Sequence, residues 1–349
     1  GINNIEEDDQ GHIISSVSSV SAIPGNDVVL TIDSVLQEET ERALADAIYD
    51  IRSKASELND YEGIDCNSGS AVVIDVHSGE ILALASAPTF NLESFNKDYE
   101  ANYNNPHNPM WNRAISGTYE PGSIFKMVTA LAGLETGVIT TNTTVECSGR
   151  YMYYAPDYMP YCWNHAGHGI TNVESAIKNS CNCFFFETGR LLTIQKLNEY
   201  TKKLGLGDYT GIEIAGEEKG IIAGPEYVEA LGETWWPGDT IQAAIGQSDH
   251  LYTPLQLCSY VATLANGGTR YKAHFVDSIK SADYSETLYE AKPEVLQELK
   301  LSPSTLNTVK KGMISMANTY KSLREADYQV AAKTGTADAK KKVNGVTVA

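Results

Sequence analysis

Three short polar motifs, far apart along the chain, constrain its fold more than any other feature. Each joins side chains that suit acyl-transfer chemistry: a serine with a lysine, a serine with an asparagine, and a lysine with two threonines around a glycine. In sequence order they are Ser123-Ile-Phe-Lys126, Ser180-Cys-Asn182 and Lys333-Thr-Gly-Thr336. A nucleophile, a proton-relaying polar pair and a basic strand that receives a carboxylate together indicate an acylating serine enzyme. The fold must therefore bring three distant segments together.

The first motif is distinguished from chance by its surroundings. Ser-x-x-Lys occurs at Ser94, Ser123 and Ser175, and isolated copies are usually surface residues. Only Ser123 follows a Pro-Gly turn and precedes an apolar stripe of helical spacing, which ends at Gly137. The pattern predicts that Ser123 lies in the first turn of a buried helix, with Lys126 on the same face.

Two properties of such a helix start suit catalysis. Burial of Lys126 near a second cation would lower its pKa and make it a neutral base for Ser123. The backbone N–H of Ser123, at the helix N-terminus, would stabilise an oxyanion.

The third motif is predicted to lie on a strand. Lys333 follows the segment 328–332 and precedes a predicted hairpin with Asn344-Gly345 at its turn. A glycine within a strand, here Gly335, allows a ligand or another backbone to approach closely. Taken alone, the motif would equally fit an ordinary edge strand with a glycine at a bulge.

Composition excludes several classes of partner. The chain has 349 residues, of which 42% are hydrophobic, so it can form a real core. A net charge of −19 argues against binding to nucleic acid or to an anionic lipid surface. The sequence lacks an apolar run of about 18 residues, so it shows neither a membrane span nor a signal peptide, and an extracytoplasmic protein would need such a segment upstream.

The order of predicted elements indicates an α+β fold, an antiparallel sheet flanked by helices and interrupted by an inserted helical region. Residues 1–26 are polar and Ser-rich, which is typical of the end of a preceding module, and the last residues resemble an interrupted strand. The predicted elements are a strand at 27–33, a helix capped by Asp33 or Ser34 with Leu44, Ile48 and Ile51 on one face, a loop at 59–68, a hairpin at 71–85, a mostly helical region at 112–266 and a helix at 304–316.

Four of the six cysteines fall within the segment 147–183, which includes the second motif. They are interleaved with His165 and His168, whereas Cys66 and Cys258 lie apart and are predicted to be buried small hydrophobes. Thiolates and imidazoles around an aperiodic Tyr-rich loop match a tetrahedral zinc site, although one or two disulfides would also fit. The predicted ligands are Cys147, Cys162, His168 and Cys181, with His165 and Cys183 as alternatives. Four protein ligands would make the site structural.

With these residues assembled, the chain resembles a class B penicillin-binding protein, of the elongation-type penicillin-binding protein 2 group or a sporulation paralogue. Some members of this family hold a zinc ion beside the active site, and their pattern falls on the four chosen ligands. The resemblance rests on the three motifs and on Leu30-Thr-Ile-Asp33, Asn112-Arg-Ala114, Tyr119-Glu-Pro-Gly122, Gly167-His-Gly169, Pro237-Gly-Asp-Thr240 and Ile245-Gly-Gln247.

The resemblance implies the penicillin-binding transpeptidase fold over residues 27–349, with 1–26 as the end of a pedestal and with a last strand and helix missing. It also implies a D,D-transpeptidase that cross-links peptidoglycan. Ser123 would attack the penultimate D-Ala carbonyl of a stem pentapeptide, and Lys126 would be its base. The other implied roles are proton relay for Ser180, donor-amide binding for Asn182, carboxylate binding for Lys333, Thr334 and Thr336 around Gly335, and an oxyanion hole from the N–H groups of Ser123 and Thr336.

By the same resemblance, the expected partners are peptidoglycan stem peptides, β-lactams that acylate Ser123, and a SEDS-type membrane glycosyltransferase. The expected location is the extracytoplasmic face of the cell membrane. Two alternatives stay open: a carboxypeptidase or β-lactamase of the same superfamily, since water and an amine compete for one acyl-enzyme, and an inactive scaffold or β-lactam sensor.

Overall fold

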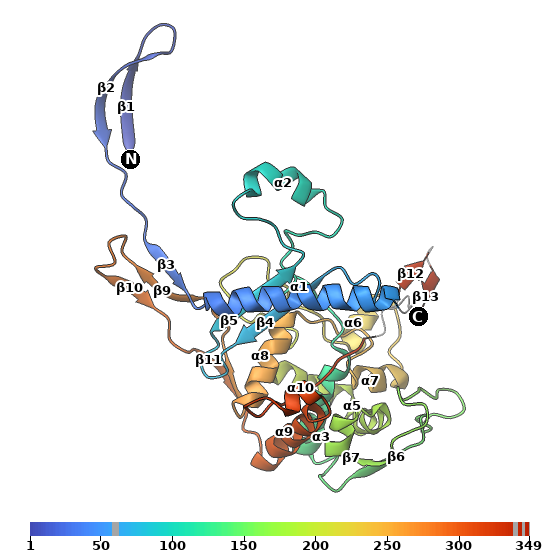
Figure 1. Ribbon diagram of the computed structural model, residues 1–349. Coiled ribbons are helices and arrows are strands. Elements are labelled where there is room, and N and C mark those ends of the chain that lie inside the picture. Colours follow the sequence, from blue (N-terminus) through green and yellow to red (C-terminus); the bar gives the residue numbers. More distant parts are fainter. Residues whose placement is uncertain (58–62, 338–340, 344–345, 349) are drawn as a thin grey trace.

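The computed structural model describes residues 1–57, 63–337, 341–343 and 346–348. It begins with a hairpin of β1 (Ile2–Glu7) and β2 (Ile13–Val20), which projects away from the rest of the chain (Figure 1). Every residue of β1 is exposed. Sequence analysis assigned no hairpin to this polar, Ser-rich segment, and the pairing of its two strands is interrupted by two register shifts.

A helix, an antiparallel hairpin and a strand pair formed by distant parts of the chain make the layer that follows. β3 (Asp27–Leu30) pairs with β9 (Val276–Lys280), and α1 (Ser34–Glu57) lies across β4 (Gly69–Ile74) and β5 (Ile81–Ala87) (Figure 1). This confirms the predicted helix at 34 and the hairpin after it.

The start of α1 is capped as the sequence predicted. The side chain of Asp33 accepts hydrogen bonds from the backbone N–H groups of Val35 and Leu36, both at 3.0 Å. Leu44 and Ile48 are half-buried, but Ile51 is 47% exposed, so the predicted apolar face is shorter than expected.

The core lies among the helices that carry the first two motifs. α3 (Lys126–Thr136) packs against α5 (Asn182–Lys203) and α9 (Pro303–Ala317), and α4 (Val173–Lys178) packs against α9. Glycines allow two of these contacts: a Cβ at Gly133 would lie 2.9 Å from the Thr188 side chain, and one at Gly312 would lie 2.7 Å from that of Ile177. The fully buried aromatic residues Phe125, Phe184, Phe185 and Phe186 fill the space between the helices.

The remaining elements complete an α+β arrangement. β6 (Thr144–Cys147) and β7 (Gly169–Asn172) pair antiparallel and bracket the Tyr-rich loop. None of the described helices combines the length and apolarity needed to cross a membrane. The other elements are α2 (Phe95–Tyr103), α6 (Pro225–Ala230), α7 (Pro237–Ala243), α8 (Pro254–Ala265), β8 (Thr269–Tyr271), β10 (Thr287–Glu290), β11 (Val295–Glu298), α10 (Lys321–Arg324), β12 (Lys341–Val343) and β13 (Val346–Val348).

The predicted strand around Lys333 is wrong. Residues 330–337 have no regular secondary structure, and no described strand lies beside them to form a ladder. The segment is held instead by single contacts, such as the hydrogen bond from Ala332 N–H to the Met313 carbonyl at 3.1 Å. The following hairpin is confirmed by the pairing of β12 with β13, while its turn, Asn344-Gly345, lies outside the described residues.

Candidate active site and metal centre

Ser123 lies in a short 3-10 turn, Gly122–Phe125, that leads directly into α3. The predicted helix start is thus a tighter turn than an α-helix, and the helix ends at Gly137 as expected. The backbone of the third motif packs on this turn: a Cβ at Gly122 would lie 2.4 Å from the Thr336 carbonyl oxygen. Gly122 also has φ of 53°, so glycine is required on two grounds.

The side chain of Ser180 joins all three motifs. Its Oγ accepts hydrogen bonds from Lys126 Nζ at 3.2 Å and from Lys333 Nζ at 3.0 Å. Lys126 Nζ also donates to the Ser180 carbonyl at 2.9 Å and to Asn182 Oδ1 at 2.6 Å. Because both lysines donate to Ser180 Oγ, its own proton is free to point into the cleft.

Both lysines have lowered pKa values. Lys126 is fully buried, and desolvation, followed by the charge of Lys333, lowers its pKa to about 7. Burial lowers the pKa of Lys333 to about 8. The sequence-based expectation for Lys126 is confirmed in direction and cause. Among the described residues, however, no hydrogen bond joins Ser123 Oγ to Lys126, whose ammonium points toward Ser180 and Asn182.

A cleft of about 640 Å³ is lined by residues of all three motifs, although neither Lys126 nor Lys333 is among its lining residues. Sequence reasoning missed several of its walls, among them Trp163, whose indole N–H donates to the carbonyls of Asn179 and Ser180 at 3.0 and 3.1 Å. The signal in the sequence that could have found Trp163 was its position next to the predicted metal ligand Cys162. The cleft is lined by Ser123, Tyr161, Cys162, Trp163, His165, Lys178, Asn179, Ser180, Asn182, Ile245, Gln247, Met316, Thr319, Tyr320, Thr334 and Thr336.

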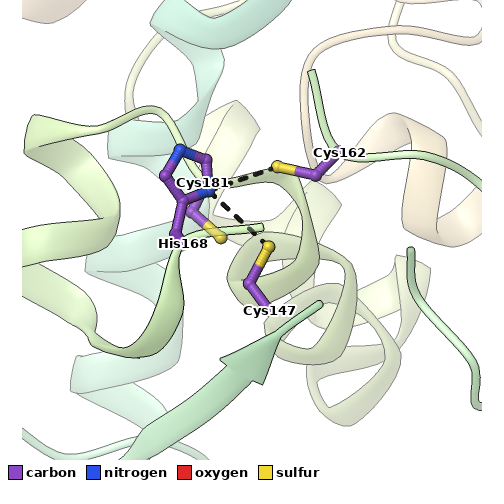
Figure 2. Close-up of side chains that lie close together, drawn as sticks. All are labelled: Cys147, Cys162, His168 and Cys181. Carbon is purple, nitrogen blue, oxygen red and sulfur yellow. Dashed lines mark hydrogen bonds between the residues drawn. The ribbon is translucent and has the colours of Figure 1, made fainter. Parts of the chain in front are cut away.

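The four predicted metal ligands lie together (Figure 2). The ligand atoms of Cys147, Cys162, His168 and Cys181 are all within 4.8 Å of one another. Nδ1 of His168 is 3.6 Å from Cys147 Sγ and 3.5 Å from Cys162 Sγ. All six cysteines are free thiols, so the disulfide alternative is not formed here. Zinc–sulfur bonds of about 2.3 Å place tetrahedral sulfur ligands roughly 3.8 Å apart, so this spacing fits a zinc ion.

The alternative ligands occupy different positions. His165 is exposed and its ring lies tilted against that of Tyr161, with ring centroids 5.0 Å apart, so it does not join the cluster. Cys183 is buried beside the cluster thiols. Cys66 and Cys258 are only partly buried, which corrects the prediction that both are buried.

The backbone around the ligands is tightly constrained. The N–H of His168 donates to the Cys147 carbonyl at 3.0 Å, and a Cβ at Gly167 would lie 2.2 Å from that same carbonyl oxygen. Cys162 Sγ accepts the N–H of Asn182 at 3.3 Å, and hydrogen bonds from the Cys181 and Cys183 thiols hold the pKa of Cys162 well below its usual value. The same hydrogen bond with Cys162 raises the pKa of the Cys181 thiol.

The convergence of three catalytic-type motifs on one cleft, within an α+β fold, defines a protein with the penicillin-binding transpeptidase architecture. Residues 69–348 match the family described as penicillin binding protein transpeptidase domain, and the chain belongs to this family, in its class B. The predicted family and fold class are confirmed.

Named relatives support the same assignment. Peptidoglycan D,D-transpeptidase MrdA of Escherichia coli strain K12 is 30% identical over 348 residues, which cover 97% of this chain and 52% of that protein. A solved structure of a peptidoglycan synthase complex that coordinates polymerization and crosslinking contains a chain with 29% identity and a TM-score of 0.83, covering 97% of this chain and 57% of that one. The structure of Pseudomonas aeruginosa PBP2 in complex with WCK 5153 has 29% identity and a TM-score of 0.75, and the match covers 89% of this chain and 68% of that one. The chain spans about half the length of the curated relatives that it matches.

Proposed function

We propose that this chain is the catalytic part of a serine D,D-transpeptidase that cross-links peptidoglycan stem peptides. The observation that carries the proposal is the meeting of Lys126 and Lys333 on Ser180, at the edge of the cleft that contains Ser123. The kinship with MrdA supports the substrate class.

The proposed acylation step uses Ser123 as nucleophile. Its Oγ forms an ester bond with the penultimate D-Ala carbonyl while the bond to the terminal D-Ala nitrogen breaks. With its pKa lowered to about 7, Lys126 is partly neutral near neutral pH and can take the hydroxyl proton. Ser180 passes a proton to the leaving amine, and an amine on a second stem peptide then attacks the ester and releases Ser123.

The remaining motif residues bind the donor. Asn182, at the start of α5, holds the donor amide, and the ammonium of Lys333 with the hydroxyls of Thr334 and Thr336 receives the terminal carboxylate. Gly335 lets this segment pack closely on the turn of the first motif, because a Cβ there would lie 2.9 Å from the Pro121 carbonyl oxygen. The N–H groups of Ser123 and Thr336 form the oxyanion hole.

The cysteine and histidine cluster is proposed to hold a structural zinc ion through Cys147, Cys162, His168 and Cys181. When bound, the ion cross-links the ends of the Tyr-rich loop to the segment that contains the second motif. Cys181 lies between Ser180 and Asn182, so its side chain would fix the backbone that carries both groups. Its thiol is fully buried.

By kinship, the protein is proposed to act on the extracytoplasmic face of the cell membrane with a SEDS-type glycosyltransferase. The similar chain in a peptidoglycan synthase complex supports that pairing. The acidic charge of −19 supports the expected absence of nucleic acid as a partner.

Intact-mass measurement after addition of benzylpenicillin tests the proposed function. The chain should gain one penicilloyl adduct, and Ser123→Ala should gain none. A long-lived adduct supports the transpeptidase, whereas rapid loss of the adduct would show a β-lactamase. The absence of any adduct on the wild-type chain would favour the scaffold or sensor alternative and refute the enzyme.

A further inference from the structure

Trp163 connects the Tyr-rich loop to the backbone of the second motif. It directly follows Cys162, and it is 62% exposed on the wall of the catalytic cleft. Its indole N–H nevertheless points into the protein and donates to the carbonyls of Asn179 and Ser180, at 3.0 and 3.1 Å. The ring also lies tilted against that of His168, with centroids 5.4 Å apart. These contacts fix the side chain in spite of its exposure.

Two described groups donate to the Ser180 carbonyl, and they differ in kind. One is Lys126 Nζ, at 2.9 Å, and the other is the indole N–H of Trp163. A carbonyl oxygen has two lone pairs, so these two donors fill it. The indole is a donor throughout, whereas a lysine that acts as a base loses and regains a hydrogen during the reaction.

Lys126 has more acceptors than a neutral amine can serve. Its Nζ donates to the Ser180 carbonyl, to Ser180 Oγ and to Asn182 Oδ1. An ammonium has three N–H groups, but the neutral amine that takes the proton of Ser123 has two N–H groups and a lone pair. One of the three contacts is therefore given up when the lone pair turns toward Ser123. The Ser180 carbonyl keeps a donor in every case, because Trp163 remains bonded to it.

The backbone conformation of Ser180 makes this second donor important. Its φ of 53° is left-handed, and a residue other than glycine keeps such a conformation only where its surroundings fix it. On one side, the N–H of Ser180 donates to the Ile177 carbonyl at 3.2 Å, at the long end of the usual range. On the other side, the carbonyl depends on Lys126 and Trp163. Without the indole, withdrawal of the lysine would release the peptide that carries the relay hydroxyl.

We propose that Trp163 is a positioning residue, which holds the backbone of Ser180 while Lys126 acts as the base. It acts through Ser180 and not through contact with the reacting bond. The inference rests on the proposed acylation reaction and deepens it. The alternative is a purely structural role, because Asn179 follows the last residue of α4, and a helix end leaves its last carbonyls without partners inside the helix.

Replacement of the indole by a benzothiophene tests the N–H alone. 3-Benzothienylalanine at position 163 keeps the two fused rings and has sulfur in place of the N–H, and Trp163→Phe is the simpler companion. In both variants the rate constant of acylation by benzylpenicillin should fall about tenfold, as expected for one lost hydrogen bond that acts in the transition state. The dissociation constant of the preceding non-covalent complex should stay within about twofold.

Trp235→Phe is the matched control. It also removes an indole N–H, which donates to Thr240 Oγ1 at 2.9 Å, and it should change neither quantity. All variants are compared as purified and at equal zinc content, because Trp163 neighbours a proposed metal ligand. Equal slowing of acylation by Trp163→Phe and Trp235→Phe would overturn the proposal.

The Ser180→Ala background separates positioning from helix capping. Because Trp163 is proposed to act through the Ser180 hydroxyl, its replacement should slow acylation less than about twofold once that hydroxyl is absent. A capping role would give the same loss with and without the hydroxyl. The same tenfold loss in both backgrounds would therefore refute the positioning role.

Amide hydrogen exchange distinguishes this inference from the proposed function, because it needs no acylation. The N–H groups of Ser180 and Cys181 donate to the carbonyls of Ile177 and Ala176. They should exchange about tenfold faster without the indole N–H of residue 163, and at the wild-type rate in Trp235→Phe. Faster exchange in a chain that forms no penicilloyl adduct would refute the transpeptidase reaction alone. Unchanged exchange in a chain that forms the adduct would refute the positioning role alone.

Discussion

At the scale of single residues, Ser180 is the junction of the candidate site. Two buried or half-buried ammonium groups donate to its Oγ, and its backbone has φ of 53°, which is unusual for a residue other than glycine. Such a conformation costs roughly 1–2 kcal/mol and persists only where the surroundings fix it. We therefore expect the hydroxyl, and not merely the fold around it, to serve the reaction.

Ser180→Ala should slow acylation by benzylpenicillin about a hundredfold, because the proton relay and the shared acceptor of both lysines are lost. The rate is measured by quenched-flow mass spectrometry. Ser259→Ala is the matched control, since the buried Ser259 hydroxyl has no hydrogen-bond partner within the described part of the chain. Equal effects of the two substitutions would show that Ser180 acts only through packing.

The pH dependence of acylation follows from the two lysine pKa values. Lys126 must be neutral to act as base, so the rate should rise with pH through about 7. Lys333 must be charged to bind the carboxylate of benzylpenicillin, so the rate should fall as pH rises through about 8. Lys333→Arg should remove the alkaline limb, because the guanidinium keeps its charge. A pH profile of the acylation rate constant checks this, and an unchanged alkaline limb in the variant would contradict the role of Lys333.

The composition of each motif and of the cysteine cluster could be recognised from the sequence, because both depend on short spacings. A lysine three residues after a serine lies on the same face of a helix as that serine, so the spacing alone indicates that the two are neighbours. In the same way, clustered cysteines with a nearby histidine indicate a metal site. The junction at Ser180 was not predictable, since Lys126 and Lys333 reach it from segments that only the fold brings together.

At the scale of elements, glycine contacts hold the third motif against the turn of the first. Gly122 meets Thr336, and Gly335 meets Pro121, so the two backbones pack without intervening side chains.

The predicted strand around Lys333 is wrong because a strand needs a partner. The local sequence gives only a tendency, and the hydrogen bonds of the ladder come from another segment. The hairpin at 69–87 succeeded because both of its strands are adjacent in sequence.

Gly122→Ala tests the contact between the two motifs. The new Cβ would overlap the Thr336 carbonyl, so the free energy of unfolding should fall by about 3 kcal/mol and acylation should slow. Gly137→Ala is the matched control: its φ of 74° is also left-handed, but the space around it is open. It should cost about 1 kcal/mol and leave acylation unchanged. Urea unfolding measures the free energy of unfolding of each variant, and adduct formation measures its acylation. Equal losses of stability in the two variants would argue against a close contact between Gly122 and Thr336.

Chelation tests the proposed zinc site beside the second motif. The purified chain should contain one zinc ion, and chelation should lower the melting temperature by more than about 5 °C and slow acylation, because the Tyr-rich loop loses its cross-link. Cys147→Ala should lose the zinc, whereas Cys183→Ala and Cys66→Ala should keep it. A metal-free sample with unchanged melting temperature and acylation rate would exclude the structural role.

At the scale of the whole molecule, the N-terminal hairpin of β1 and β2 does not pack against the rest of the described chain. β1 makes its substantial contacts with β2 alone, and the first residues of the folded body are those of β3 (Figure 1). We expect the boundary proposed from sequence, near residue 26, to be a real limit of cooperative folding. Because the burial of apolar surface sets stability, a hairpin with an exposed β1 adds little to it.

Deletion of residues 1–20 should therefore leave the melting temperature within about 1 °C of the full chain and leave acylation by benzylpenicillin unchanged. Deletion of residues 1–30, which also removes β3, is the matched comparison. It takes away β3, which pairs with β9. The next residue, Thr31, whose N–H donates to the Phe275 carbonyl at 3.0 Å, then becomes the start of the chain. That longer deletion should destabilise the chain clearly. If the short deletion lowers the melting temperature as much as the long one, the hairpin belongs to the folded body and the boundary near residue 26 is wrong.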